Sequence, residues 1–250
     1  MSKIALVTGG LGGLGTAMCK SLAQAGHKVI TTYYTDGSDK FAEEAVAWEA
    51  KMKSEGFDFK AYPCDVASYE SCEAAAALIK ADFGSVDILV NNAGITRDGM
   101  FKKMGKDKWD AVISTNLSSA FNLTKQFLDD MVEKGWGRVI NIASINGQKG
   151  QAGQTNYSAA KAGLHGFTMA LAQEVCRKGV TVNTIAPGYA ATDMVMAIAE
   201  EIRNKIIAGI PMGRLAKPEE IAGTVVYLAS DVAGFMTGAQ LAINGGQHMM

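Results

Sequence analysis

The sequence predicts an α/β fold of the Rossmann type, in which helices cover both faces of one doubly wound parallel sheet. Short apolar runs alternate with helical patterns along the 250 residues, which is typical of parallel strands buried between helices. Several of these runs end at glycines or polar residues, and ligands bind at the carboxyl ends of strands in such sheets. No linker or break in composition divides the chain, so we expect residues 1–250 to form a single domain.

The first half of the chain predicts four strands and three helices. Each strand segment is apolar or β-branched, and each helical segment has apolar residues at helical spacing followed by a glycine. The expected strands are 3–8, 28–33, 58–64 and 86–91, and the expected helices are 16–25, 40–55 and 69–83.

The second half continues the alternation. Pro218 stands near the start of one helical segment, where a missing N–H costs little. We expect the glycine-rich segment between Ser144 and Tyr157 to be a loop. The expected helices are 109–133, 156–177, 200–208 and 219–230, and the expected strands are 138–143, 180–186 and 240–244.

Composition excludes several classes of protein. The 24 Lys and Arg residues balance 25 Asp and Glu, which argues against a nucleic-acid binder with a basic face. No segment reaches the roughly 20 apolar residues of a membrane span, so we expect no membrane partner. The four cysteines and three histidines lack zinc spacing, so we expect no metal and a reduced, cytoplasmic protein.

A glycine-rich turn, TGGLGGLG at residues 8–15, follows the first predicted strand. Glycines allow a phosphate to approach the backbone N–H groups at the start of the next helix. A P-loop would need Lys and then Ser or Thr after its last glycine, whereas Gly15 is followed by Thr16 and Ala17. We predict a dinucleotide pyrophosphate at this turn, with a plain strand-to-helix turn as the alternative.

The end of the second predicted strand indicates which dinucleotide binds. No carboxylate stands at Tyr33 or Tyr34, where NAD-binding folds often carry an acid for the ribose 2′-hydroxyl. Ser38 and Lys40 follow and are candidates to bind a 2′-phosphate, although two aspartates close by weaken this argument. We therefore expect NADPH rather than NADH, with an ordinary solvated lysine as the alternative role of Lys40.

Three polar residues after the fifth predicted strand form a candidate catalytic group. Ser144 follows the strand, Tyr157 comes thirteen residues later, and Lys161 lies four beyond it on the same helix face. An ammonium beside a phenol lowers a pKa of about 10, and a general acid works best near the working pH. The pair is expected to protonate an alkoxide, although an isolated Tyr-x-x-x-Lys is usually a surface pair.

Together these residues resemble the short-chain dehydrogenase/reductase family over essentially the whole chain. The resemblance rests on the glycine turn at 8–15, the NNAG segment at 91–94, and Ser144, Tyr157 and Lys161. It places further family positions on the following residues: Asn116, Asp65, Val66, Pro187, Gly188 and Thr192.

The resemblance implies a role for each catalytic residue. Tyr157 would be the general acid, and Ser144 would orient the carbonyl. Lys161 would lower the pKa of Tyr157 and bond the nicotinamide ribose, and Asn116 would support a water-linked proton route to Lys161. The implied cofactor contacts are Gly9, Gly12, Gly13, Leu14, Gly15, Tyr34, Lys40, Asp65, Val66, Asn92, Ala93, Gly94, Tyr157, Lys161, Pro187, Gly188 and Thr192.

Finer matches concern the substrate. Segments 92–98, 144–157, 161–174 and 244–249 are similar to 3-oxoacyl thioester reductases, in particular acetoacetyl-CoA reductases. This likeness implies NADPH-dependent formation of (R)-3-hydroxybutyryl-CoA for polyhydroxybutyrate synthesis. Ala152 departs from it, because a bulkier apolar residue is expected there. The expected substrate contacts are Asp98, Ser144, Gln151, Gln154 and Tyr189. The alternative for Asp98 is a structural role, and the alternative for Gln151, Gln154 and Tyr189 is that they only fill polar positions of their loops.

Other interpretations remain open. A 3-oxoacyl-[acyl carrier protein] reductase would need a basic patch, for which Lys134, Arg138, Arg177 and Lys178 are candidates. A non-catalytic dinucleotide-binding regulator would keep the glycines but have no reason to keep the catalytic group. Family members commonly pair the helix expected at 156–177 across subunits, and its small residues suit such pairing, so the resemblance implies a homotetramer.

Overall fold

The apolar runs of the sequence form the strands of one parallel sheet. The computed structural model describes residues 2–249, and within them the seven strands follow the order β3-β2-β1-β4-β5-β6-β7, every neighbouring pair being parallel. The order reverses between β1 and β4, as in doubly wound sheets, and the predicted fold class is confirmed. The strands are β1 (Ile4–Thr8), β2 (Lys28–Tyr33), β3 (Lys60–Pro63), β4 (Ile88–Asn91), β5 (Gly137–Ile142), β6 (Val180–Pro187) and β7 (Gln240–Ile243).

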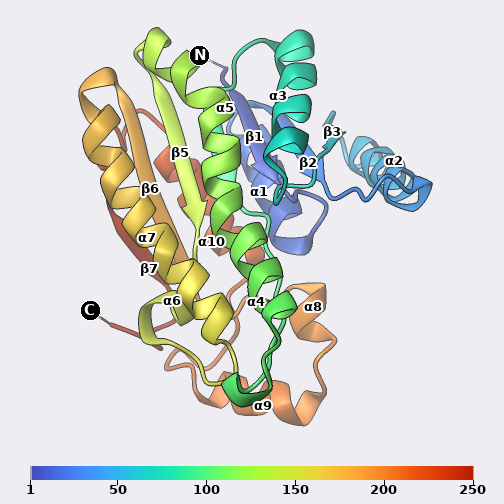
Figure 1. Cartoon of the computed structure of the whole chain (residues 1–250), viewed down its shortest axis with the longest axis vertical. Helices are drawn as coiled ribbons and strands as arrows, with labels where there is room; N and C mark the ends of the chain where they lie inside the picture. The colour runs from blue at the N-terminus through green and yellow to red at the C-terminus, as the bar shows by residue number, and fades with distance from the viewer. Residues whose placement is uncertain (1, 250) are drawn as a thin grey trace.

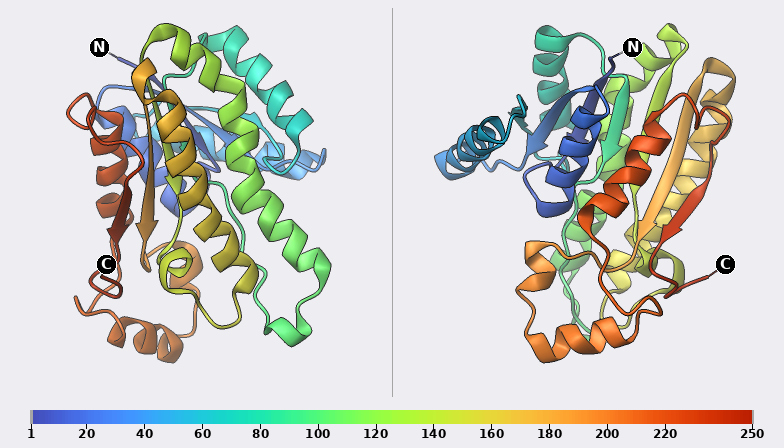
Figure 2. Two further views of the ribbon diagram at one scale, coloured as in Figure 1. Left: turned by 60° about the vertical axis from the view of Figure 1, so that its left-hand side comes forward. Right: turned by 180° about the vertical axis from the view of Figure 1, so that it is seen from behind.

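Helices cover the two faces of the sheet. In Figure 1, α3 (Tyr69–Phe83), α5 (Ser119–Lys134) and α7 (Thr155–Val175) lie in front of the strands. From behind, Figure 2 shows the other layer, which contains α1 (Gly13–Gln24) and α10 (Pro218–Ala229), while α2 (Asp39–Ser54) lies toward the β3 edge.

Each face of the sheet has its own hydrophobic core. Successive strand residues point to opposite faces, so Val7 packs with residues of α1 and α10, while Leu6 packs with residues of α3, α5 and α7. Both side chains are fully buried. Burial on both sides explains why the strands appear as continuous apolar runs in the sequence rather than as alternating patterns.

Short elements gather beyond the carboxyl ends of the strands, at the lower end of the molecule in Figure 1. They surround the place where the sequence predicts ligand binding. They are a 3₁₀ turn η1 (Phe101–Lys103) and the helices α4 (Lys106–Ile113), α6 (Ile145–Lys149), α8 (Asp193–Met196) and α9 (Glu200–Ala208). A further 3₁₀ turn, η3 (Cys176–Lys178), extends α7 at the opposite end of the sheet.

The structure corrects the expectation of an uninterrupted helix over 109–133. A π-helical turn, η2 (Ser114–Ser118), separates α4 from α5. Such turns insert one extra residue into a helix and are frequent at functional sites. Here the turn carries Asn116, which is 2% exposed and whose amide bonds to the backbone of Ile95.

The segment after Ser144 is also not simply a loop. It contains α6, for which Ser144 is the N-cap residue, and the Ser144 Oγ accepts the N–H of Asn146 at 3.1 Å. A side-chain cap of this kind stabilises the first turn of a helix. The strand expected at 58–64 is shorter than predicted, and most other boundaries differ by one to three residues.

Two properties of the described residues concern membranes and metals. No helix within 2–249 is long and apolar enough to cross a bilayer. In the same part of the chain, no three His, Cys, Asp or Glu side chains lie together in a way that would hold a metal ion.

Candidate active site

The glycine-rich turn leads from β1 into the start of α1. Gly12 is the N-cap residue, no side chain caps the first turn, and that turn carries no acidic residue. Gly9 has a φ of +65°, a left-handed conformation that favours glycine. The first N–H groups of α1 therefore have no side-chain acceptor within the turn, and such groups attract anions.

The glycines of this turn differ in what a side chain would meet. A Cβ on Gly15 would lie 2.7 Å from the Gly10 Cα, and a Cβ on Gly10 would lie 2.7 Å from the Thr31 Cβ. The packing of the chain itself requires glycine at these two positions. A Cβ on Gly12 would meet nothing closer than the Gly9 oxygen at 3.6 Å, and its φ of −72° suits any residue. Glycine at position 12 therefore leaves an open space, a cradle, in front of the first turn of α1, which a side chain would fill. A pyrophosphate bound to the N–H groups of that turn would occupy this space.

The segment after β4 forms a wall of this cradle. The Thr8 Oγ1 accepts the N–H groups of Asn92 and Ala93, each at 2.9 Å, and the Asn92 side chain donates to the Thr8 carbonyl at 2.8 Å. On the other side, the Thr192 Cβ lies 3.4 Å from where a Cβ of Gly13 would be. Residues predicted from three separate parts of the sequence therefore meet around the start of α1.

Tyr34 and Lys40 lie together beyond β2. The ring of Phe41 is 5.0 Å from the Tyr34 ring and 5.7 Å from the Lys40 Nζ. Asp36 is close by, and hydrogen bonds from Ser38 lower the pKa of its carboxyl group. This carboxylate is therefore charged at neutral pH and opposes an anion, while Lys40 attracts one.

Asp65 and Val66 follow β3, the strand next to β2. The Asp65 Oδ1 accepts the N–H of Ala67 at 3.0 Å, and the Val66 carbonyl accepts the Asn122 side chain at 3.0 Å. These bonds shape the segment at the carboxyl end of β3, where the resemblance places the adenine.

Lys161 is buried behind the nicotinamide side of the predicted site. Its side chain is 3% exposed, and its Nζ donates to the Ile142 carbonyl at 2.7 Å. Burial lowers its pKa to about 8. A Cβ on Gly94 would lie 3.5 Å from this Nζ and 3.0 Å from the Asn116 Oδ1, so Gly94, Asn116 and Lys161 come together as predicted.

Tyr157 lies one helical turn before Lys161, whose Nζ is 5.7 Å from the centre of the phenol ring. Burial raises the pKa of Tyr157, and the Ser144 hydroxyl opposes this increase only in part. The expected lowering by Lys161 is therefore wrong for the chain by itself. The reason is that burial of the phenol has the largest effect, while the Lys161 ammonium donates to the Ile142 carbonyl rather than to the phenol.

Ser144 stands beside a chain of polar side chains. The Gln154 amide donates to Asp98 and accepts from the Asn146 side chain, both at 2.9 Å. The Asn146 backbone N–H in turn donates to Ser144. Gln151 is exposed. Sequence reasoning missed Asn146, although its place two residues after a capping serine was a usable signal.

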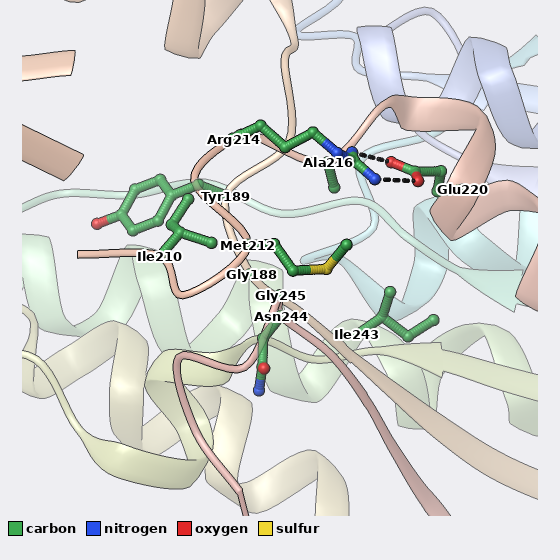
Figure 3. Close-up of a pocket in the computed structure, with 10 residues that line it drawn as sticks. All are labelled: Gly188, Tyr189, Ile210, Met212, Arg214, Ala216, Glu220, Ile243, Asn244 and Gly245. Atoms are coloured by element: carbon green, nitrogen blue, oxygen red, sulfur yellow. Dashed lines mark hydrogen bonds and ion pairs between the residues drawn. The ribbon is translucent and has the colours of Figure 1, made fainter. Parts of the chain in front are cut away.

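Tyr189 lines a small cavity of about 90 Å³ at the carboxyl ends of β6 and β7. Figure 3 shows it with Ile210 and Met212, and with the Arg214–Glu220 ion pair on the wall. The lining also includes residues of the C-terminal segment, Asn244 and Gly245. The Tyr189 side chain raises the pKa of Tyr157, which places the two phenols within electrostatic reach.

The four basic residues considered for an acidic carrier protein do not lie at this site. Lys134 pairs with the buried Asp87 at 2.7 Å, and Arg138 is only 4% exposed. All four come immediately before or at the start of β5 and β6, whereas Ser144 follows the carboxyl end of β5. The prediction that these residues form a carrier patch at the site is therefore wrong. In a parallel sheet all amino ends of the strands lie at one end and all carboxyl ends at the other, so the four residues lie at the end of the sheet opposite Ser144.

Comparisons with known proteins agree with this geometry. Residues 3–203 match the family described as short chain dehydrogenase. The chain is 59% identical over 244 residues to nodulation protein G of Azospirillum brasilense, covering 98% of this chain and 97% of that protein. It is 55% identical over 247 residues to acetoacetyl-CoA reductase of Cupriavidus necator (99% and 98% covered). It is 44% identical over 248 residues to 3-oxoacyl-[acyl-carrier-protein] reductase FabG of Vibrio cholerae (99% and 98% covered).

Proposed function

The chain belongs to the short-chain dehydrogenase family, and from this premise we propose that it reduces acetoacetyl-CoA to (R)-3-hydroxybutyryl-CoA with NADPH. It is an oxidoreductase acting on CH–OH groups. The observation that carries the proposal is the meeting of Ser144, Tyr157 and buried Lys161 at the carboxyl end of β5. The likeness to acetoacetyl-CoA reductases supports this substrate, whose product would feed polyhydroxybutyrate synthesis.

In this proposal Tyr157 donates the proton that converts the carbonyl oxygen to a hydroxyl. The phenol is protonated at neutral pH, since burial raises its pKa further above the ordinary value, so the proton is present for donation. Efficient transfer requires a pKa nearer the working pH, and we assign that lowering to the Lys161 ammonium once cofactor and substrate are bound. The Ser144 hydroxyl donates to the same oxygen and fixes its position beside the phenol. Bound NADPH supplies the hydride that reaches the carbonyl carbon.

Lys161 and Asn116 support the proton donor. We assign the Lys161 Nζ to the nicotinamide ribose, and its buried position beside the Ile142 carbonyl holds it there. Asn116 bonds to both backbone polar groups of Ile95, which fixes the segment next to Gly94. A water held between Asn116 and Lys161 would then return a proton to Tyr157.

Affinity for NADPH is expected to fall as the pH rises above about 8. Burial lowers the pKa of Lys161 to about 8, so its positive charge, which favours the anionic cofactor, is present below that pH and lost above it. The measurement is cofactor binding by fluorescence between pH 6 and 10. A Tyr157→Phe variant serves as the control because it has no phenol at 157 to titrate. Binding that is independent of pH in both proteins would contradict this assignment.

The remaining cofactor contacts follow the two ends of the dinucleotide. We propose that Gly9, Gly12, Gly13, Leu14 and Gly15 hold the pyrophosphate. We further assign the adenosine half to Tyr34, Lys40, Asp65 and Val66, and the nicotinamide half to Asn92, Ala93, Gly94, Pro187, Gly188 and Thr192. The glycines, Asn92, Ala93 and Thr192 meet around the start of α1, which supports the pyrophosphate site. The adenosine contacts follow the carboxyl ends of β2 and β3, and Pro187 and Gly188 lie at the carboxyl end of β6.

NADPH is expected to exceed NADH in kcat/KM by about tenfold or more, or about 1.4 kcal/mol. Positions 33 and 34 are tyrosines, so no carboxylate repels a 2′-phosphate there, and Lys40 is exposed where it could bind one. Lys40→Ala is expected to reduce the preference by roughly two- to fivefold, as for an exposed charge. Lys20→Ala, which removes a partly exposed ion pair between α1 and Glu55 at the end of α2, is the control. A preference for NADH in the unmodified protein would contradict the proposed cofactor.

Acetoacetyl-CoA is expected to be reduced with a kcat/KM at least about tenfold above that of the same acyl group on acyl carrier protein. The four basic residues considered for a carrier lie at the amino ends of β5 and β6, opposite the end that carries Ser144, which favours the coenzyme A ester. Purified protein, saturating NADPH and both thioesters suffice for the measurement. Faster reduction of the carrier-linked substrate would favour a 3-oxoacyl-[acyl carrier protein] reductase instead.

For the thioester we propose contacts with Asp98, Gln151, Gln154 and Tyr189. Gln154 already bonds to Asp98 and Asn146, so its contribution would be to hold the entrance in shape. We also propose that residues 1–250 act as one domain in a cytoplasmic homotetramer. The exposed face of α7, which carries Gly166 and Met169, supports subunit pairing, and light scattering would test it.

A further inference from the structure

Two buried thiols lie side by side at the carboxyl end of β3. The Sγ atoms of Cys64 and Cys72 are 3.8 Å apart. Both cysteines are free, and their side chains are 1% and 0% exposed. Cys64 comes directly after β3 and Cys72 lies in the first turn of α3. A disulfide needs an S–S distance of about 2.05 Å, so a small movement of either element would join them.

The chain between these cysteines carries the proposed adenine contacts. Asp65 and Val66 follow Cys64 directly, and the Asp65 N–H donates to the Ser71 Oγ, next to Cys72. The Cys72 thiol itself faces the Val66 carbonyl at 3.7 Å. Any movement that draws Cys64 and Cys72 together therefore acts on the backbone of Asp65 and Val66.

We propose that Cys64 and Cys72 form a reversible intramolecular disulfide on reaction with a hydroperoxide, and that this modification weakens the binding of NADPH. The second part of the proposal rests on the proposed function, because it takes Asp65 and Val66 as the adenine site. The protein would then slow its consumption of NADPH under oxidative conditions.

The chemistry uses both thiols and one peroxide. The Cys64 thiolate attacks one oxygen of hydrogen peroxide, the O–O bond breaks, and the leaving hydroxide takes up a proton as water. The Cys72 sulfur then attacks the Cys64 sulfenic acid, the S–S bond forms, and a second water leaves with the Cys72 proton. The two sulfurs lose two electrons in total and the peroxide gains them.

The surroundings of the pair suit this order of events. The contact between the two sulfurs lowers the pKa of Cys64 and raises that of Cys72, so Cys64 is the more easily ionised of the two thiols. Burial restricts access to small oxidants during local opening, and it keeps Cys72 in place to capture the sulfenic acid before further oxidation. By contrast, burial raises the pKa of Cys19 to about 12, which makes that thiol a poor nucleophile.

The test begins with reduced, desalted protein treated with hydrogen peroxide, followed by alkylation and peptide mass analysis. We expect the tryptic peptide that carries both Cys64 and Cys72 to remain unalkylated and lighter by two hydrogen atoms, and to be restored by dithiothreitol. The dissociation constant for NADPH is expected to rise by about fivefold or more, while kcat at saturating NADPH stays within about twofold. By reciprocal linkage, NADP⁺ is expected to slow formation of the disulfide.

Variants assign these effects to the pair. Cys64→Ala and Cys72→Ala should each abolish the peroxide effect on NADPH binding, whereas Cys176→Ser, which removes an exposed thiol, should retain it. Complete alkylation of Cys64 and Cys72 after peroxide treatment would overturn the proposal. So would a disulfide that leaves NADPH affinity unchanged. Failure of the reduced protein to bind NADPH would instead refute the proposed cofactor and, with it, the effect on binding, while the mass analysis would still decide whether the thiols pair.

Discussion

Replacement of Tyr157 by phenylalanine is expected to lower kcat/KM for acetoacetyl-CoA by roughly 10²–10⁴-fold, the usual contribution of a general acid. The substitution removes one oxygen and keeps the ring that packs near Lys161. The phenol has a raised pKa because of burial, so it is a protonated donor across the neutral range. NADPH affinity and Tm are expected to stay close to those of the unmodified protein.

The matched control for this experiment is Tyr189→Phe. It also removes one phenol oxygen near the site, from a side chain that lines the neighbouring cavity. We expect its effect to be mainly on KM, with less than about a tenfold loss in kcat, because it removes a substrate contact rather than the proton donor. Activity of Tyr157→Phe near that of the unmodified protein would refute the catalytic assignment.

Gly12→Val is expected to weaken NADPH binding by roughly a hundredfold, or about 2.7 kcal/mol, with little change in Tm. A Cβ at this position meets nothing in the protein closer than 3.6 Å, and the φ of −72° is allowed for valine. The new side chain would therefore fill only the cradle at the start of α1. Calorimetric titration with NADPH, together with a thermal melt, measures both quantities.

Gly15→Ala supplies the contrast within the same turn. Its Cβ would lie 2.7 Å from the Gly10 Cα, and overpacking of this kind costs about 1–3 kcal/mol. We therefore expect a Tm lower by several degrees, about 2–4 °C for each kcal/mol in a chain of this size. If Gly12→Val lost stability and kept its affinity for NADPH, the position of the cofactor cradle would be wrong.

Much of this arrangement could be predicted from the sequence. The order of strands and helices follows from apolar runs between helical patterns, because both faces of the sheet are buried. The glycine turn and the Ser144, Tyr157 and Lys161 group follow from short-range spacing, since residues four apart on a helix share a face. Parallel strands then bring their carboxyl ends to one edge, which explains why distant motifs such as Asn92 and Thr192 meet there.

Other features depend on contacts that local patterns do not encode. In the π-helical turn, the Asn116 side chain bonds to both the N–H and the carbonyl of Ile95, a partner 21 residues away in the sequence. The short helix α6 was not predicted because it has only five residues, two of which, Asn146 and Gly147, have low helix propensity. Its cap at Ser144 and its packing against α7 stabilise it.

The sequence by itself therefore determined the fold class and the family, and it predicted the residues of the candidate catalytic group, because each depends on residue type and on local spacing. Only the tertiary structure decided their electrostatics and their neighbours. Burial reversed the expected direction of the Tyr157 pKa and lowered that of Lys161. The folding of the chain also placed the four basic residues considered for a carrier at the end of the sheet opposite Ser144, and it brought Cys64 against Cys72. The physical reason is that desolvation and side-chain pairing depend on the three-dimensional surroundings of a group, which form only when distant segments pack together.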